Sequence, residues 1–600
     1  MKINDINFLI GGKAGEGIEQ PSNMFAKICM RAGLYIHVTQ EFYSVIKGYN
    51  TIAQIRTSEK PVKSHTNHYD LVLSIDDETV PRYLDDIVPG GGLIYDPILV
   101  TDESAKQSEV ISGGALTYTS AEMKKRLEKK KDINLFPIPL TQIAQETVGL
   151  KLAKNIVGIG ATMALVNYDI HPLLEMIIKQ FARKGDDIVN KNIAAAQAGY
   201  DYAKTNFSKE FNYQVRPIKN AARKFLVSGN TAMVMGAIKA GCKFVSEYPM
   251  SPSSSILHEM AKHARQYNIS VNHVEDEIAA INMAIGAGYA GVRSMAATSG
   301  GGFALMTEAI GMAGMIEAPV VIIECQRPGP STGLPTRNGQ GDLRTVMHAS
   351  QGEFPRVVLS PGTQEEAFNM AFEAFNLAEK YQIPVILLTE KYLGEGHATL
   401  PFLETDHLKV DRGKLLTESD ITENFKRYGA TKDGVPLRTI PGQKGGAHVA
   451  TTYEHLESGY FTEEVEPVNK IFARRMKKME TIQKKLPSVQ LEGVKDAEVT
   501  IVCWGATYMP ATEALDLLAR DGIKANLLHV KYLLPLQPNL QEVLEKCKHP
   551  IIVEANYTGQ LAGVIAEKLG IEIQDKVLDW SGRPFTPDQI ADGIKKCLKT

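Results

Sequence analysis

Residues 318–343 read APVVIIECQRPGPSTGLPTRNGQGDL, and this segment decides how the rest of the chain is interpreted. It begins with a β-branched apolar run at 320–323, which is short enough for a buried strand. A loop rich in Pro, Gly, Ser and Thr follows and carries Arg327 and Arg337. Open α/β sheets bind ligands in loops at the carboxyl ends of their strands, and guanidinium groups there suit a carboxylate or phosphate. For an arbitrary loop, two solvated arginines on the surface are the simpler interpretation.

The order of strand, turn and helix repeats on both sides of this segment. This alternation predicts a parallel sheet with helices on both faces. Strands are expected at 242–245, 269–271, 320–323, 356–359 and 385–388.

The chain of 600 residues is too long for one core. We expect an α/β protein with three domains and mainly parallel sheets. The predicted boundaries are an α/β domain at 1–196, a linker at 197–222, a second α/β domain at 223–395, an irregular arm at 396–495 that reaches across a neighbouring subunit, and a last α/β domain at 496–600.

A glycine-rich turn, GGKAGEG at 11–17, follows a predicted strand at 6–10 and precedes a helix. Its spacing is G-G-x-x-G-x-G, which differs from the dinucleotide pattern G-x-G-x-x-G. A glycine turn at a helix amino terminus offers backbone N–H groups to an anion. Tight packing between strand and helix explains the glycines equally well.

Composition excludes several classes of protein. A formal net charge of −3 argues against bulk binding of nucleic acid or of a membrane surface. No apolar run reaches the roughly 18 residues that span a bilayer, and the amino terminus leads into a strand-like run, so we expect a cytoplasmic protein. The six cysteines are scattered without a C-x-x-C pair, which leaves no signature for an iron–sulfur cluster or a structural zinc in this chain.

Four loops follow predicted strands and should converge on one edge of one sheet. They are YPMSPSS at 248–254, HVEDE at 273–277, TSGGG at 298–302 and the long loop at 326–343. Together they carry hydroxyl groups, two arginines and Glu277, which stands just before a helix of small residues. The competing carboxylates are Glu275 and Asp276, and Glu277 itself could be an ordinary first-turn glutamate favoured by the helix dipole.

These four loops resemble those of the α subunits of 2-oxoacid:ferredoxin oxidoreductases, most closely 2-oxoglutarate:ferredoxin oxidoreductase with a γ domain fused at the amino terminus. The resemblance covers nearly the whole chain. The turn at 11–17 looks like the γ domain, residues from about 223 like the thiamine-diphosphate pyrimidine domain, and residues from about 496 like the transketolase carboxyl-terminal domain. The family turn has Thr where this chain has Ser251.

The resemblance implies oxidative decarboxylation of 2-oxoglutarate with coenzyme A and ferredoxin to succinyl-CoA and CO₂, or the reverse, CO₂-fixing reaction. It also implies a β subunit, in an α₂β₂ assembly, that carries a [4Fe–4S] cluster and shares thiamine diphosphate and Mg²⁺ with this chain. The family's magnesium pattern, GDG with an Asn roughly 25–30 residues later, is incomplete at Asp342 with Asn369 and at Asp186 with Asn190. We therefore assign no metal ligand to this chain.

The resemblance also implies roles for individual residues. Glu277 would hydrogen-bond the aminopyrimidine ring so that the ring acts as the internal base, and Ala279, Ala280 and Gly286 would leave room for it. The other expected contacts are Thr298, Ser299 and Gly300 with thiamine diphosphate, Ser251 and Arg337 with the 2-oxoacid, Arg327 with the 2-oxoacid or as a brace of the loop, and Gly12, Gly15 and Gly17 with coenzyme A.

Three alternatives stay open at this point. Within the class, the substrate is pyruvate or a branched-chain 2-oxoacid. In a different class, the chain is an NAD(P)-binding oxidoreductase that uses the glycine turn at 11–17, or a scaffold without catalytic activity.

Overall fold

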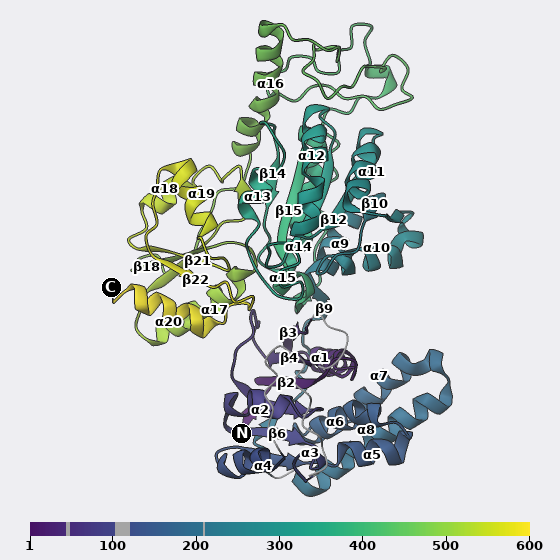
Figure 1. Ribbon diagram of the computed structural model, residues 1–600, viewed down its shortest axis with the longest axis vertical. Helices are drawn as coiled ribbons and strands as arrows, with labels where there is room; N and C mark the ends of the chain where they lie inside the picture. Colours follow the sequence, from purple (N-terminus) through teal and green to yellow (C-terminus); the bar gives the residue numbers. More distant parts are fainter. Residues whose placement is uncertain (44–48, 102–119, 208–209, 600) are drawn as a thin grey trace. The chain divides into compact units, whose positions relative to one another are not determined.

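The computed structural model describes residues 1–43, 49–101, 120–207 and 210–599. The chain divides into two compact units, which are drawn in Figure 1. The first unit joins Met1–Val227 to Gly396–Leu403, and the second joins Ser228–Glu395 to Glu404–Thr600. Both contain α/β layers, which confirms the predicted fold class. Within the described ranges, no helix is long and apolar enough to cross a membrane.

The first unit is built on an eight-stranded sheet of order β7-β6-β5-β2-β4-β3-β16-β9. Strands β2, β5, β6 and β7 run parallel, whereas β4, β3 and β16 continue the sheet in antiparallel fashion. The strands are β2 Ile6–Lys13, β3 Tyr35–Glu41, β4 Asn50–Ser58, β5 Tyr69–Ser74, β6 Ile87–Tyr95, β7 Asn134–Pro137, β9 Lys224–Ser228 and β16 His397–Pro401.

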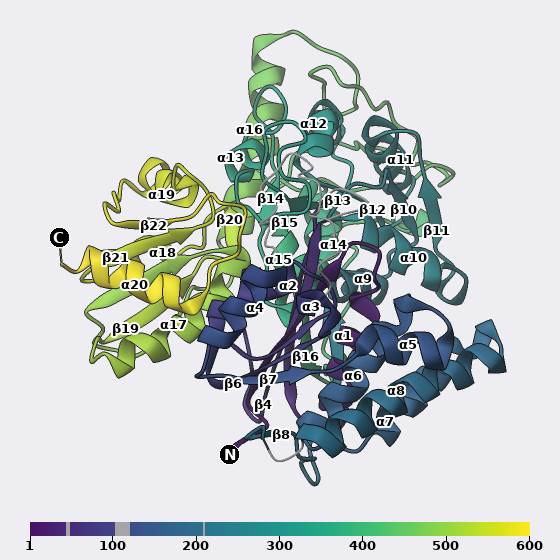
Figure 2. The ribbon, with the colours of Figure 1, turned by 60° about the horizontal axis from the view of Figure 1, so that its bottom comes forward.

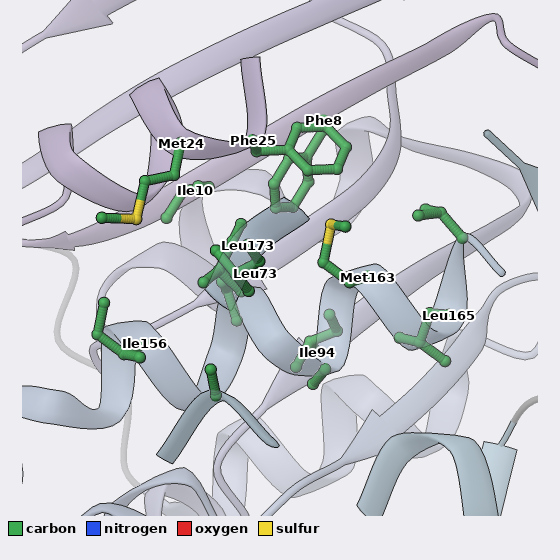
Figure 3. Packing of buried hydrophobic residues seen from close by; sticks show 14 of the residues in the cluster. Phe8, Ile10, Met24, Phe25, Leu73, Ile94, Ile156, Met163, Leu165 and Leu173 are labelled. Carbon is green, nitrogen blue, oxygen red and sulfur yellow. The ribbon is translucent and has the colours of Figure 1, made fainter. Parts of the chain in front are cut away.

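Helices cover this sheet through a large apolar core. Figure 3 shows Phe8 of β2, Phe25 of α1, Leu73 of β5 and Leu173 of α7 gathered in it. The rings of Phe8 and Phe25 meet edge to face, with centroids 5.0 Å apart. The main helices are α1 Glu19–Arg31, α4 Ser120–Lys129, α5 Leu140–Val148, α6 Lys154–Leu165, α7 His171–Phe181 and α8 Asp186–Phe207.

Helix α8 runs through the predicted boundary at residue 196 into the segment that we expected to be a linker. It packs against α6 at very short range, because a Cβ at Gly160 or Gly199 would lie 2.1 Å from a backbone oxygen of the other helix. The buried face of α8 consists largely of alanine and glycine. Such small residues give little hydrophobic periodicity, which explains why the sequence pattern indicated a linker with some helix and did not reveal the full extent of α8.

The second unit contains two sheets. A seven-stranded sheet has the order β11-β10-β12-β13-β15-β14-β20, parallel except for β20 at its edge, and a five-stranded sheet has the order β17-β19-β18-β21-β22. The first comprises β10 Phe244–Glu247, β11 Ser270–His273, β12 Ser294–Thr298, β13 Val320–Gln326, β14 Val357–Leu359, β15 Pro384–Glu390 and β20 Tyr532–Leu534. The second comprises β17 Leu491–Gly493, β18 Val499–Cys503, β19 Ala525–His529, β21 Pro550–Glu554 and β22 Lys576–Leu578.

Helices lie on both faces of each of these sheets, as Figures 1 and 2 show. Helices α11 and α12 share a core with one face of the larger sheet, while α18 and α19 pack on one face of the smaller sheet and α17 and α20 on the other. The bounds are α9 Gly229–Lys239, α10 Ser254–Tyr267, α11 Glu277–Tyr289, α12 Gly300–Met315, α14 Gln364–Tyr381, α17 Tyr508–Arg520, α18 Leu540–Glu545, α19 Gln560–Leu569 and α20 Pro587–Cys597.

The segment predicted as an arm, 396–495, has four parts, and the last of them contains β17, which belongs to the five-stranded sheet. Its first residues form β16, which pairs with β3 in the sheet of the first unit. The part up to residue 464 is mostly irregular, and α16, Val465–Gln483, follows it. The sequence missed β16 because strand pairing depends on a backbone partner more than 350 residues away.

Two buried carboxylates anchor the rest of the arm to its own chain. Glu317, after α12, pairs with Arg474 and Lys478 of α16, with Lys478 Nζ at 2.5 Å. Glu379, in α14, accepts from Arg293 Nε at 2.7 Å and from Arg438 Nη1 at 3.3 Å. Each carboxylate is buried among several cations, so removing one partner would leave an uncompensated charge in the interior.

Candidate active site

The four predicted loops lie at the carboxyl edge of the seven-stranded sheet. They follow β10, β11, β12 and β13, and these strands run parallel as neighbours in the order β11-β10-β12-β13. The register places Thr298, the last residue of β12, opposite Glu324 of β13. The sheet therefore brings together loops that are widely separated in the sequence, as the βαβ pattern predicted.

Glu277 is the first residue of α11 and is buried, with 3% of its surface exposed. Its Oε1 atom has no hydrogen-bond partner among the described residues. The two neighbouring carboxylates do not share these properties. Asp276 caps the helix by accepting a hydrogen bond from the Ala279 N–H at 2.8 Å, and Glu275 is exposed to solvent. Of the three candidates, only Glu277 thus offers a buried carboxylate with an unused acceptor.

The first turn of α12 closes over this carboxylate. A Cβ at Gly302 would lie 2.5 Å from Glu277 Oε1 and 2.2 Å from Thr298 Oγ1, so no larger residue fits there without a shift. Thr298 and Ser299 are fully buried, and Ser299 Oγ has no hydrogen-bond partner within the described part of the chain. The arrangement leaves two polar atoms, Ser299 Oγ and Glu277 Oε1, available to a ligand.

Arg327 and Ser251 come together at the same edge. Arg327 Nη1 donates to the carbonyl oxygen of Ser251 at 2.9 Å. Two hydrogen bonds hold the turn after Ser251. Asn230 Nδ2 donates to the carbonyl of Pro252 at 2.9 Å, and Ser253 Oγ forms a hydrogen bond with Glu247 Oε1 at 3.1 Å. Arg327 therefore has the geometry of a brace for the Ser251 turn.

Arg337 is held by a different domain. The next residue, Asn338, donates its N–H to the Gly582 carbonyl at 3.0 Å and accepts from the Tyr392 N–H at 2.9 Å. A Cβ at Gly582 would lie 3.1 Å from Arg337 Cβ. The half-buried side chain of Arg337 is thus positioned by a loop of the carboxyl-terminal domain.

Gln340 joins the two domains of the second unit and was not singled out from the sequence. Its fully buried side chain makes four hydrogen bonds, to Glu390 Oε1 at 3.0 Å, the Trp504 carbonyl at 2.9 Å, Thr507 Oγ1 at 2.9 Å and the Ala555 N–H at 2.9 Å. Burial raises the pKa of Glu390 to about 8, although the Ala506 N–H and Gln340 oppose this shift.

Other buried carboxyl groups near strand ends were also missed, among them Glu247 and Glu324 in the seven-stranded sheet and Glu554 in the five-stranded sheet. Burial raises the pKa of Glu247 well above its ordinary value, despite a hydrogen bond from Ser253. A signal for all of them exists in the sequence, since each acid stands at or near the carboxyl end of an apolar strand. Among the described residues, no three His, Cys, Asp or Glu side chains form a group that could hold a metal ion.

The predicted glycine turn at 11–17 belongs to the first unit, where it links β2 to α1. Gly12 lies in β2, and a Cβ there would lie 2.5 Å from Ile18 Cδ1 and 3.2 Å from Ile75 Cβ, so a larger residue would require these side chains to shift. Gly15 and Gly17 have φ values of 93° and 70°, a backbone region that favours glycine. Space is open around the position of a Cβ at Gly15, and Ile18 caps α1 without a side-chain hydrogen bond.

Three domain families match the chain. Residues 235–474 match "Pyruvate flavodoxin/ferredoxin oxidoreductase, thiamine diP-bdg", residues 7–202 match "Pyruvate ferredoxin/flavodoxin oxidoreductase", and residues 490–592 match "Transketolase, C-terminal domain". These matches agree with the predicted pyrimidine and transketolase-like domains.

Several known proteins are similar over most of the chain. The α subunit of 2-oxoacid:ferredoxin oxidoreductase 1 from Sulfurisphaera tokodaii is 35% identical over 99% of this chain and 98% of its own. The 2-oxoglutarate oxidoreductase subunit KorA from Mycobacterium tuberculosis is 32% identical over 76% of this chain and 71% of its own. Among solved structures, 2-oxoglutarate:ferredoxin oxidoreductase from Magnetococcus marinus, with 2-oxoglutarate, coenzyme A and succinyl-CoA bound, has a TM-score of 0.87 and 30% identity over 99% of both chains.

Proposed function

The chain belongs to the family of 2-oxoacid:ferredoxin oxidoreductase α subunits, and we propose that its substrate is 2-oxoglutarate. The complete enzyme would convert 2-oxoglutarate, coenzyme A and oxidised ferredoxin to succinyl-CoA, CO₂ and reduced ferredoxin, or run in the CO₂-fixing direction. The names of the relatives from M. tuberculosis and M. marinus support this substrate. The observation that carries the thiamine-diphosphate chemistry of this proposal is the buried Glu277 carboxylate, whose Oε1 has no partner in the described chain.

The residues around Glu277 fit thiamine diphosphate. The cofactor supplies an electron sink for decarboxylation when it is bound. Glu277 Oε1 is an unused acceptor for the aminopyrimidine, and Gly302 leaves the approach to it free of a side chain. Thr298, Ser299 and Gly300 would line the same end of the site, where Ser299 Oγ is a second unpartnered polar atom.

For the 2-oxoacid we propose contacts from Ser251 and Arg337. Ser251 is exposed at the sheet edge, and Arg337 offers a guanidinium that suits a carboxylate. Arg327 would act mainly as a brace, because its Nη1 already donates to the Ser251 carbonyl. Pyruvate and branched-chain 2-oxoacids are the alternative substrates.

The remaining parts of the proposal concern partners. A β subunit would hold the diphosphate with Mg²⁺ and a [4Fe–4S] cluster, in a cytoplasmic α₂β₂ assembly that reduces ferredoxin. Coenzyme A would bind at the turn containing Gly12, Gly15 and Gly17. Open space at Gly15 and the uncapped amino terminus of α1 support an anion there, whereas Gly12 is explained by packing alone.

Reconstitution with a β subunit tests the proposal. Ferredoxin reduction that depends on coenzyme A is measured with 2-oxoglutarate, pyruvate and a branched-chain 2-oxoacid. We expect 2-oxoglutarate to have the highest kcat/KM, and the isolated chain to be inactive and free of iron. A preference for pyruvate would support the alternative substrate, and activity of this chain alone would refute the dependence on a β subunit. Titration of the full chain with NADPH should show no binding, since binding would favour the nucleotide class.

A further inference from the structure

The carboxyl group of Glu247 has no role in the function proposed above, yet it contacts the turn that carries Ser251. Glu247 is the last residue of β10 and is fully buried. Its Oε1 atom lies 3.1 Å from the hydroxyl oxygen of Ser253, two residues beyond Ser251. Its Oε2 atom is buried without a hydrogen-bond partner in the described part of the chain. One oxygen of Glu247 therefore holds the turn, and the other is left unpaired.

The Ser253 hydroxyl, which is also fully buried, has one proton but contacts two oxygens that can accept it. Its Oγ atom lies 2.8 Å from the Met250 carbonyl oxygen and 3.1 Å from Glu247 Oε1. If Glu247 were ionised, these two acceptors would compete for the single proton of the hydroxyl. Both contacts can be hydrogen bonds at once only when Glu247 supplies a second proton, because the carbonyl has none to give.

The surroundings of Glu247 favour the same protonation state. A buried carboxylate with an unpaired oxygen is costly, and the neutral acid costs far less. Burial accordingly raises the pKa of Glu247 well above its ordinary value, and no cation among the described residues offsets this effect.

The side chain and the backbone of Glu247 act on different parts of the site. The backbone carbonyl accepts from the Val274 N–H at 3.2 Å, in the loop that leads to Glu277. The side chain reaches only the Ser251 turn, through Ser253. A change of the side chain alone should therefore affect the Ser251 turn and leave the Glu277 loop in place.

We propose that Glu247 is a neutral acid that donates a hydrogen bond to Ser253 Oγ, and that Ser253 in turn donates to the Met250 carbonyl and so holds Ser251 in position for the 2-oxoacid. Glu247 and Ser253 are thus positioning residues that act through the turn. This role in substrate binding rests on the proposed function, in which Ser251 contacts the 2-oxoacid.

Proton release on unfolding tests the protonation of Glu247 with the chain alone. At about pH 7 a carboxyl group is ionised in the unfolded chain, so a neutral Glu247 releases its proton when the chain unfolds in unbuffered denaturant. We expect Glu247→Gln to release one proton fewer per chain than the wild type. Glu365→Gln, which removes an exposed carboxylate on α14, should release as many as the wild type. Equal release from Glu247→Gln and the wild type would overturn the neutral acid.

Kinetics of the reconstituted complex test the positioning role. Glu247→Leu and Ser253→Ala each remove a member of the hydrogen-bonded chain and should raise KM for 2-oxoglutarate roughly fivefold to tenfold. Glu247→Gln keeps a donor for Ser253 and should keep KM within about twofold of the wild type. Exchange of the thiamine C2 proton, which depends on Glu277, should be unchanged in all three variants.

Ser294→Ala is the matched control for Ser253→Ala. Ser294 Oγ is buried and donates to the Ala284 carbonyl at 2.6 Å, but Ser294 begins β12 and so lies at the opposite edge of the sheet. Its loss removes a similar hydrogen bond and should leave KM unchanged.

Three results would overturn the positioning role of Glu247. They are an unchanged KM in both Glu247→Leu and Ser253→Ala, equal rises in KM for Glu247→Leu and Glu247→Gln, and a rise in Ser294→Ala as large as that in Ser253→Ala. A complex that turns over no 2-oxoacid would instead refute the proposed function, and the proton count would still decide whether Glu247 is neutral.

Discussion

Replacement of Gln340 by alanine should weaken the attachment of the carboxyl-terminal domain to the pyrimidine domain. The four side-chain hydrogen bonds of Gln340 join groups of both domains, and all four partners lie in the interior. A buried hydrogen bond contributes about 1 kcal/mol, and four of them therefore give about 4 kcal/mol. Because 1.4 kcal/mol is tenfold in an equilibrium constant, local opening should become roughly a thousand times more frequent.

Hydrogen exchange at the Ala506 N–H measures this opening directly. That group donates to Glu390 Oε1 at 2.7 Å and makes no bond to Gln340, so its exchange reports the contact between the domains. Hydrogen exchange at one amide is a better measure of this contact than global unfolding of the chain, because a chain with several domains need not unfold in one step. An acceleration of roughly a thousandfold is expected for Gln340→Ala.

Gln560→Ala is the matched control for this experiment. Gln560 also joins the long loop to the carboxyl-terminal domain, with bonds to Gly341 and Arg344, but these bonds are exposed to solvent. Its loss should cost less than about 1 kcal/mol. An acceleration below about tenfold in Gln340→Ala, or equal effects of the two variants, would refute the conclusion that Gln340 fastens the domains together.

Three further predictions concern the acidic and basic groups of the site. Glu277→Gln should leave the complex assembled but abolish exchange of the thiamine C2 proton, measured by NMR, and normal exchange would remove Glu277 from catalysis. Arg337→Ala should raise KM for 2-oxoglutarate by about 10- to 100-fold with cofactor binding retained, because a charged hydrogen bond contributes about 1.5–3 kcal/mol. An unchanged KM would show that Arg337 does not bind the substrate. The folded pKa of Glu390 is about 8 and lies above its ordinary value of 4.5, so the stability from its proton is complete below about pH 4.5 and is lost as pH rises to about 8. Between about pH 4.5 and pH 8, the free energy of unfolding should fall by up to about 1.4 kcal/mol per pH unit more in the wild type than in Glu390→Gln. If the free energy of unfolding had the same pH dependence in both proteins, the raised pKa of Glu390 would be contradicted.

Much of the second unit could be predicted from local patterns. The apolar run at 320–323 lies inside β13, and the loop that follows lies at the carboxyl edge of the sheet as expected. Glu277 stands just before a run of small residues that predicts a helix, and it begins α11; its choice over Glu275 and Asp276 came from the family resemblance. These features succeed because strand alternation, turn residues and helix starts are properties of neighbouring residues.

Other features depend on residues far apart in the sequence. Strand β16 joins a sheet whose other members, apart from β9, precede residue 140, and α8 packs through small residues that give almost no pattern. Likewise, nothing in the sequence around Gln340 marks it as important. Its role appears only in the folded chain, where its side chain forms hydrogen bonds with Glu390, Trp504 and Ala555.

The sequence by itself determined the α/β class, the family and the loop of residues 326–343 with its two arginines. Only the tertiary structure decided how those arginines differ, since Arg327 braces the Ser251 turn and Arg337 is placed by a loop of the carboxyl-terminal domain. The physical reason is that hydrogen bonds and charge interactions depend on separations and burial in space, which a local pattern of residues does not contain.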